Sequence, residues 1–159
     1  METKESNKFL KRFMEINHDP SRPKTFNTIY LCDEKKRLHK TVLEFEHLYR
    51  YHFPTENVMR INGSDFVSAF MSSIVGGFCE EFKKSFRNLD LLIFEDVEEI
   101  SGKDACMETA YIIIDYLLES HCCIVFASEM LPREMLSLED RNRTQFEGCP
   151  IHNLRDGNE

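Results

Sequence analysis

The chain has 159 residues, of which 42% are hydrophobic and 30% are charged, proportions that exclude a disordered protein and fit one folded domain. No apolar run approaches the roughly 18 residues of a membrane span, and the amino terminus lacks the apolar core of a secretory signal, so we expect a cytoplasmic protein that contacts no membrane. The formal net charge is −8, but the charges are unevenly distributed, because residues 1–40 hold ten Lys or Arg against six Asp or Glu. The rest of the chain is acidic and cannot wrap duplex DNA, so any DNA contact is expected to be local and weak.

The first 27 residues are predicted to form a basic leader followed by a linker. Within residues 1–27, Phe9, Phe13 and Ile16 recur at helical spacing before two prolines interrupt the pattern, which predicts a short helix and then a linker. A solvated and partly mobile leader is the favoured interpretation, and an arm that binds nucleic acid is the alternative. A single core domain is expected to follow at residues 28–159.

The core is predicted to open with a strand, a loop and a helix. Residues 28–32 form a short apolar run with β-branched side chains, typical of a buried strand. A charged turn then leads into a helix over residues 38–52, whose apolar side chains share one face. A second strand at 58–61 and a helix that Ser64 can cap repeat the alternation.

The same alternation continues to the end of the chain. We predict a third strand at 89–94, a helix at 104–119, a fourth strand at 122–127 and a short last strand at 151–154. Strands that are apolar on both faces and separated by helices require a parallel sheet that is covered on both sides. The sequence therefore predicts a three-layer α/β fold with about five parallel strands.

Five phenylalanines recur at helical spacing on either side of the Gly76–Gly77 pair, which is expected to interrupt the helix. Exposed aromatic side chains can stack on the bases of single-stranded nucleic acid. Helical spacing instead favours a place in the hydrophobic core. The five residues are Phe66, Phe70, Phe78, Phe82 and Phe86.

The six cysteines are predicted to be reduced structural thiols. They form no C-x-x-C pair, and several lie inside apolar strand or helix patterns. The one cluster with histidine, His121-Cys122-Cys123, would point its neighbours to opposite faces of a strand. We therefore expect no metal site.

Two adjacent carboxylates, Glu95 and Asp96, stand at the end of the third predicted strand. A buried strand that delivers two acids at its carboxyl end has the form of a Walker B element, in which one acid holds magnesium through water and the next activates the attacking water. On these residues alone, an equal alternative is that the acids only solvate the end of the strand.

Four segments resemble the DnaA and Hda group of AAA+ proteins, which includes the bacterial replication initiators. They are similar, in order, to the family's second strand with its following helix, its Walker B strand, its sensor 1 strand and the segment that carries its arginine finger. The four segments are VMRINGSDFVSAF, EEFKKSFRNLDLLIFEDVEEI, IVFASEMLPREM and LEDRNRTQFEG. The resemblance implies a P-loop NTPase-like AAA+ fold, and a chain that stops before the family's helical lid and its helix-turn-helix domain.

The chain departs from the family's pattern in the loop that would bind the phosphates of a nucleotide. Residues 1–62 contain no glycine, whereas a P-loop needs glycines so that backbone N–H groups can turn toward phosphates. In its place stands CDEKKRLH, a loop that we expect to be about three residues longer than the family's, in which Asp33 and Glu34 would repel phosphate. We therefore expect no bound cofactor. The resemblance implies a vestigial nucleotide-binding set of Lys40, Thr41, Asp96 and Ser128.

Catalysis is not expected, because further positions depart from the family. Glu95 stands in place of the magnesium-binding aspartate. Gln145 stands in place of the trans-acting arginine finger, so no positive charge would offset the transition state. Asp96, Ser128 and Arg141 keep the pattern. The partner interface that the resemblance implies comprises Arg141, Arg143 and Gln145.

Single-stranded DNA is another ligand of the family, and the resemblance assigns contact positions to Met71, Lys103 and Ala105. Lys103 keeps a positive charge. Ala105 stands where an arginine is expected, and Met71 stands where the family has a smaller aliphatic side chain. The resemblance therefore implies that about half of this DNA contact is lost.

Three hypotheses follow for the function. The first is a non-catalytic binding or regulatory module that docks on an AAA+ partner, such as the replication initiator, and changes its assembly. The alternative is a weak nucleotide-binding switch, held by Lys40, Thr41 and Asp96, with little or no ATPase activity. An unrelated hydrolase that uses Glu95 and Asp96 or a cysteine lacks a supporting nucleophile–base spacing.

Overall fold

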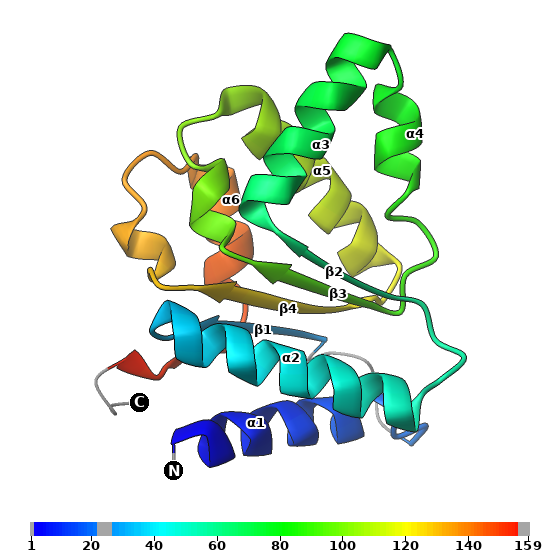
Figure 1. Ribbon diagram of the computed structural model, residues 1–159, viewed down its shortest axis with the longest axis vertical. Coiled ribbons are helices and arrows are strands. Elements are labelled where there is room, and N and C mark those ends of the chain that lie inside the picture. The colour runs from blue at the N-terminus through cyan, green and yellow to red at the C-terminus, as the bar shows by residue number, and fades with distance from the viewer. Residues whose placement is uncertain (1, 22–26, 156–159) are drawn as a thin grey trace.

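A five-stranded parallel sheet forms the middle layer of the computed structural model (Figure 1). The structure describes residues 2–21 and 27–155, and of residues 2–7 only the backbone. The strand order is β2-β3-β4-β1-β5, and every pairing is parallel. The predicted α/β fold and strand number are thus confirmed. The strands are β1 (Thr28–Cys32), β2 (Val58–Asn62), β3 (Leu91–Glu95), β4 (Cys123–Ser128) and β5 (Ile151–Asn153).

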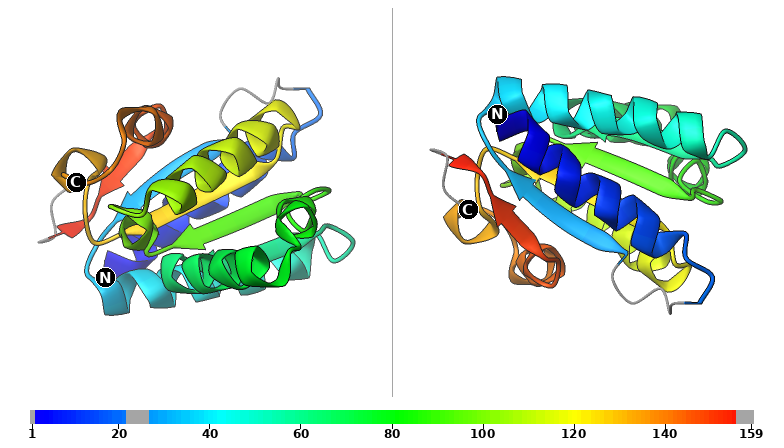
Figure 2. Two further views of the ribbon diagram at one scale, coloured as in Figure 1. Left: turned by 90° about the horizontal axis from the view of Figure 1, so that it is seen from above. Right: turned by 90° about the horizontal axis from the view of Figure 1, so that it is seen from below.

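Helices cover both faces of the sheet, which gives three layers (Figure 2). On one face lie α1 (Glu2–Asn17) and α2 (Lys35–His52). The other face is covered by α3 (Gly63–Gly76), α4 (Cys79–Lys84), α5 (Asp104–Glu119) and α6 (Asp140–Glu147), together with the short 3-10 helices η1 (Val97–Ile100) and η2 (Pro132–Glu134).

The core consists of two hydrophobic clusters, one on each side of the sheet. Alternate side chains of a strand enter different clusters: in β3, Leu91 and Ile93 pack beneath α1 and α2, whereas Leu92 and Phe94 pack beneath α3 to α6. Because both faces are covered, all five residues of this strand are buried. This explains why the strands are continuous apolar runs in the sequence.

The phenylalanine stripe belongs mostly to the core, as its spacing predicts. Phe66 and Phe82, for example, lie with ring centroids 5.4 Å apart. Phe78 is the exception, since 43% of its surface is exposed. It follows Gly77, whose left-handed backbone (φ of 73°) ends α3 at the predicted break. The buried members are Phe66, Phe70, Phe82 and Phe86.

The predicted amino-terminal helix is present as α1, but it packs against the sheet and is not a solvated leader. Leu10, Phe13 and Met14 of α1 are buried in the same cluster as the apolar face of α2. A solvated leader is therefore wrong for residues 8–17, because these apolar side chains cover the part of the sheet that α2 leaves open (Figure 2). Residues 22–26 of the predicted linker lie outside the described residues.

Two local expectations around the second and third helices are also wrong. Helix α2 begins at Lys35, three residues before the predicted start, so that only Asp33 and Glu34 separate it from β1. The expected longer loop is therefore a two-residue connection. Helix α3 is capped by Asn62, whose side-chain oxygen accepts the N–H of Asp65 at 2.8 Å, and Ser64 lies within the helix.

Five of the six cysteines are buried, in keeping with structural thiols. Burial raises the pKa of Cys32 and Cys149 to about 11, so both thiols stay protonated near neutral pH. Within residues 2–21 and 27–155, no three His, Cys, Asp or Glu side chains gather in a group that could hold a metal ion. No helix of this part of the chain is long and apolar enough to cross a membrane.

Candidate functional site

The acids and the serine of the predicted site meet at the carboxyl edge of the sheet. Cys32 at the end of β1 lies opposite Ser128 of β4, and Glu95 of β3 lies opposite Ala127. Glu95, Asp96 and Ser128 therefore flank the connection from β1 to α2. Parallel sheets bind ligands at this edge, where the first strand continues into its helix.

Lys40 and Thr41 do not reach the start of α2. The helix begins at Lys35, so Lys40 lies about 7.5 Å further along its axis. Lys40 is exposed, whereas Thr41 is 1% exposed and packed among the buried side chains of α2. The early helix start thus removes these two residues from the place where a P-loop presents its Lys and Ser/Thr.

A carboxylate of the chain itself occupies the start of α2. The Asp33 side chain is 3% exposed, and its Oδ1 atom accepts the backbone N–H of Glu34 at 2.7 Å. Arg37, one turn into the helix, donates to the same oxygen at 2.7 Å and pairs with Glu34 at 3.3 Å. The amino end of a helix favours an anion. Here the nearest anion is Asp33, which bonds the N–H of Glu34, the residue immediately before the helix.

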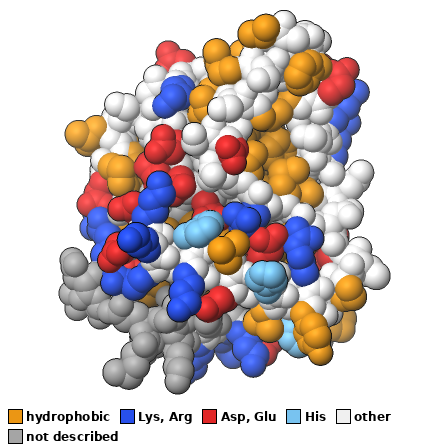
Figure 3. Space-filling view, viewed as in Figure 1, with side chains coloured by type: hydrophobic (Ala, Val, Ile, Leu, Met, Phe, Trp, Pro, Cys, Tyr) orange, Lys and Arg blue, Asp and Glu red, His pale blue; other side chains and the backbone are white. Residues whose placement is uncertain are grey.

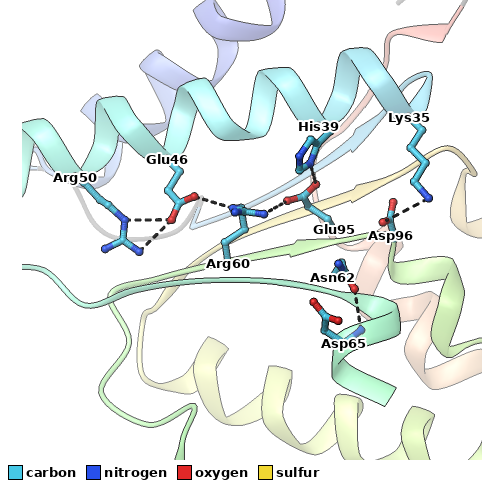
Figure 4. A network of polar contacts seen from close by, with 9 residues as sticks. All are labelled: Lys35, His39, Glu46, Arg50, Arg60, Asn62, Asp65, Glu95 and Asp96. Atoms are coloured by element: carbon cyan, nitrogen blue, oxygen red, sulfur yellow. Dashed lines mark hydrogen bonds and ion pairs between the residues drawn. The ribbon is translucent and has the colours of Figure 1, made fainter. Parts of the chain in front are cut away.

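Both oxygens of the Glu95 carboxylate are engaged by donors from α2 and β2 (Figure 4). His39 Nδ1 lies 2.8 Å from Oε2, and Arg60 Nη1 lies 3.0 Å from Oε1. Arg60 also donates to Glu46 at 2.7 Å, and Glu46 accepts from Arg50 at 3.0 Å. The Glu95 side chain is only 6% exposed. A chain of alternating charges therefore holds this acid in place.

The charge pairing changes the proton affinities of this network. The hydrogen bond to Glu46 raises the pKa of Arg60. Burial opposes ionisation of Glu46, but hydrogen bonds from Arg60 and Arg50 outweigh it and lower the pKa of Glu46. Arg60 and Glu46 therefore both remain charged across the neutral range, and Arg60 stays a cationic partner for Glu95.

Asp96 has a different environment. Its backbone is left-handed, with φ of 52°, and its side-chain Oδ2 lies 3.9 Å from Lys35 Nζ. Burial raises the pKa of Asp96; Lys35 opposes the shift, and Glu95 adds to it. A Cβ atom on Gly63 would lie 2.2 Å from the Asp96 backbone oxygen, so glycine is needed where α3 approaches this turn.

Ser128 is bonded within the chain. Its hydroxyl donates to Glu98 Oε1 at 2.6 Å and accepts the backbone N–H of Met130 at 3.0 Å. Burial raises the pKa of Glu98, and the Ser128 hydrogen bond opposes that shift. The serine that the resemblance assigns to ligand sensing thus contacts an acid of η1.

A cavity of about 420 Å³ lies between α2 and the carboxyl ends of β2 and β3 (Figure 4). Its walls carry cations from α2 and β2 and carboxylates from β3. None of the lining residues is Phe, Tyr, Trp or aliphatic, so the apolar part of the lining comes from the His39 ring and from the alkyl stems of the Lys and Arg side chains. The lining residues are Lys35, Lys36, His39, Arg60, Asn62, Glu95 and Asp96.

The model of the bacterial DnaA ATPase domain family matches residues 4–151, nearly the whole chain, from α1 to the first residue of β5. The chain belongs to the bacterial DnaA ATPase domain family. This family match confirms the resemblance on which the site residues were chosen.

Several DnaA proteins are also similar to this chain in sequence. The chromosomal replication initiator DnaA of Corynebacterium jeikeium is 32% identical over 134 residues, which cover 83% of this chain and 23% of that protein. DnaA of Acinetobacter baumannii is 34% identical over 93 residues, covering 58% of this chain and 20% of that protein. The chain thus spans about a fifth of the length of these relatives.

Solved DnaA structures share the fold. AMPPCP-bound DnaA from Aquifex aeolicus superposes with a TM-score of 0.79 at 18% identity, over 92% of this chain and 44% of that chain. Domain III of Thermotoga maritima DnaA gives 0.77 at 23% identity, over 92% and 61%. A replication initiator DnaA bound to AMPPCP and single-stranded DNA gives 0.76 at 20%, over 92% and 44%. These matches confirm the AAA+ fold.

The residues assigned to a DnaA partner interface are largely engaged within the chain. Arg143 donates to the backbone oxygen of Met135 at 2.7 Å and so holds the loop before α6. Gln145 donates to the backbone oxygen of Tyr111 in α5 at 3.1 Å. Arg141 lies over the Tyr111 ring at 4.7 Å, with 43% of its side chain exposed. Arg141 also pairs with Glu139 at 3.5 Å, and it is the more exposed of the two arginines.

The DNA contact positions are accessible but weakly charged. Met71 is half exposed, and Ala105 is exposed. The Lys103 ammonium donates to the backbone oxygen of Glu99 at 2.8 Å. A single cation among these three positions gives little attraction for a phosphate backbone.

Five residues belong to the site but were not predicted from the sequence: Arg37, His39, Glu46, Arg60 and Glu98. Asp33 and Arg37 stand at helical i, i+4 spacing, a signal that could have extended the helix to include them. Arg60 interrupts an otherwise apolar strand, which could have marked it as the partner of an acid on the neighbouring strand. His39, Glu46 and Glu98 carried no comparable local signal.

Proposed function

We propose that this chain is a non-catalytic DnaA-like module that regulates the initiation of chromosomal replication by binding an AAA+ protein, most simply the replication initiator of the same cell. The observation that carries the proposal is the position of the Asp33 carboxylate at the start of α2. The carboxylate lies next to the end of the helix at which a P-loop protein receives phosphate, which supports the proposal that an internal anion takes the place of the nucleotide.

The energetics oppose ordinary nucleotide affinity. A two-residue connection without glycine offers no wrapped backbone cradle, and each hydrogen bond to a charged phosphate oxygen that is lost costs about 1.5 to 3 kcal/mol. A phosphate at the start of α2 would also have to displace the Asp33–Arg37 pair, in which Asp33 is 3% exposed. Residues 33–37 as a whole carry two acids against three cations, so the obstacle to phosphate is the buried Asp33 carboxylate and not the net charge of the turn.

The groups that hydrolysis would require are committed to other contacts. Glu95 accepts from His39 and Arg60. Ser128 donates to Glu98. Gln145 is directed toward α5 and carries no charge. These contacts support a chain without ATPase activity, because phosphoryl transfer depends on the complete set of charged groups acting together.

The family supports the choice of partner. Its relatives are named chromosomal replication initiators. AAA+ subunits pack side by side through unlike surfaces, so a subunit that offers one good face can end or block a growing assembly. Arg141 is 43% exposed and lies over Tyr111, which presents its guanidinium as a candidate contact for such a neighbour.

The alternative is a weak nucleotide-binding switch with little or no ATPase activity. The cavity of about 420 Å³, with Lys35 and Lys36 on its wall, is the observation that favours it. In that case the phosphates would contact side chains of α2 and β2, with the Asp33–Arg37 pair left intact.

Thermal unfolding in the presence of Mg-ATP and Mg-ADP tests the nucleotide question. A ligand at a hundred times its dissociation constant adds about 2.7 kcal/mol, which raises the midpoint by several degrees at this chain length. An unchanged midpoint at millimolar nucleotide is expected. A saturable rise would support the switch instead.

Co-purification with the initiator of the same cell tests the partner. The wild-type chain is expected to retain the initiator, and Arg141→Glu is expected to release it. Arg87→Glu is the control, since Arg87 is exposed and lies over Tyr116 at the other end of α5. Retention of no AAA+ protein, or equal loss in both variants, would contradict the proposed interface.

A further inference from the structure

Four large apolar side chains are exposed together where α3 ends and α4 begins. Their exposed fractions are 50% for Met71, 46% for Ile74, 88% for Val75 and 43% for Phe78. We call these four residues the α3 tip. Figure 3 shows hydrophobic side chains gathered over the upper part of α3 and along α4. Apolar side chains at this density on a surface require an explanation.

The α3 tip has a fixed shape. Gly77 ends the helix in a left-handed conformation, and the N–H of Phe78 donates back to the Ser73 oxygen at 2.9 Å. A Cβ atom on Gly76 would lie 2.2 Å from Phe78 Cε1, so the phenyl ring rests directly on the glycine backbone. A rigid apolar surface loses little conformational entropy when it is covered.

The α3 tip is large enough to drive a weak association. The exposed fractions correspond to roughly 400 Å² of apolar surface, within the range in which such patches mark contact sites. Leu136 provides the comparison: it is 91% exposed, but its exposed sequence neighbours are polar. Single exposed apolar residues of that kind are common on soluble proteins.

The charges beside the α3 tip indicate the occupant. Helix α4 has Glu80 and Glu81 in its first turn and Lys83 and Lys84 in its last turn. Lys83 pairs with Glu80 within the helix at 3.3 Å, so Glu81 and Lys84 are the charges offered to a second copy. The four charges cancel, so they give no attraction for nucleic acid. Two copies of α4 in antiparallel contact would place the acidic end of each against the basic end of the other. The same order also suits the helix dipole, so it orients the contact while the apolar side chains drive it.

We propose that the α3 tip is a two-fold contact with a second copy of this chain. Helix α3 begins at the carboxyl end of β2 and is 14 residues long, so the α3 tip lies about 12 to 20 Å along the helix from the candidate site. The dimer therefore leaves the carboxyl edge of the sheet open to another partner. Because the contact is small, its dissociation constant is expected to be on the order of 100 µM.

Sedimentation velocity from about 10 µM to about 1 mM, which brackets that constant, tests the dimer. The wild-type chain is expected to shift from monomer to dimer. Val75→Asp is expected to weaken the dimer at least about thirtyfold, because a carboxylate would be buried in the contact. Val75 is 88% exposed, so folding should be unaffected. Leu136→Asp is the matched control and should leave the dimer unchanged.

The charge pairing tests the orientation. Glu81→Lys is expected to weaken the dimer about fivefold at low salt, and the double variant Glu81→Lys with Lys84→Glu is expected to restore it. A chain that stays monomeric at about 1 mM would overturn the proposal. So would a dimer that is insensitive to Val75→Asp or equally weakened by Leu136→Asp. Failure of the double variant to restore association would refute the antiparallel arrangement.

Discussion

Replacing Glu95 with glutamine removes the negative charge on which Arg60 and His39 converge. A hydrogen bond to a charged group contributes about 1.5 to 3 kcal/mol when its partner would be left buried. Arg60 is 32% exposed and keeps Glu46 as a partner, and the His39 side chain is 52% exposed and can return to water. These exposures reduce the combined loss to about 2 to 3 kcal/mol, or about 6 to 10 °C in the unfolding midpoint at this chain length.

Urea unfolding followed by circular dichroism measures this change. Glu99→Gln is the control, because Glu99 is an exposed acid four residues away and should alter stability by less than about 0.5 kcal/mol. An acid retained for catalysis commonly reduces stability, so its replacement would be neutral or stabilising. A Glu95→Gln variant as stable as the wild type would refute a structural role for the carboxylate.

Three further substitutions give expected outcomes. Asn142→Leu should stabilise the fold by up to about 1 kcal/mol in urea unfolding, because Asn142 is fully buried and its Oδ1 atom has no hydrogen-bond partner in the described part of the chain, although the lost Nδ2 bond to the Met107 oxygen reduces the gain; a reduced stability would contradict this account. Asp33→Ala should destabilise the fold by about 2 kcal/mol and produce a measurable affinity for inorganic phosphate by calorimetry, because Arg37 loses its nearest acid; a variant without phosphate affinity would weaken the internal-anion argument. Burial raises the pKa of Asp96 above its ordinary 3.8, so its contribution to stability is largest below pH 3.8 and falls as pH rises through the folded-state pKa. Asp96→Asn should therefore gain stability relative to the wild type from about pH 4 to pH 7, and a difference that does not change with pH would refute the assignment.

The strands were predictable because burial on both faces leaves a mark that does not depend on distant residues. All of β3 and β4 is buried, and the sequence shows these strands as continuous apolar runs. The break at Gly77 was equally predictable, since a left-handed residue at a helix end is most often glycine. Both features follow from short-range chemistry.

The start of α2 was not predictable from apolar periodicity, because charged residues form its first turn. Asp33 and Arg37 close that turn through an ion pair, and the periodic apolar pattern begins only at Leu38. The packing of α1 was missed for a different reason. Its apolar face is short, and only the open area beside α2 shows that there is a surface for it to cover.

The sequence predicted the two acids of the candidate site, but it did not predict the residues that pair with them. Glu95 and Asp96 are adjacent in sequence, so one strand brings both to the edge of the sheet. Arg60 reaches Glu95 from 35 positions away and His39 from 56. Such contacts depend on the order of strands in the sheet, which a single sequence does not encode locally.

A crystal structure of the chain grown with millimolar Mg-ATP tests the central claim most directly. The account predicts that the Asp33 carboxylate remains on the Glu34 N–H and the Arg37 guanidinium, with no polyphosphate between β1 and α2. A triphosphate bound to the backbone N–H groups at the start of α2, with Asp33 displaced, would contradict it.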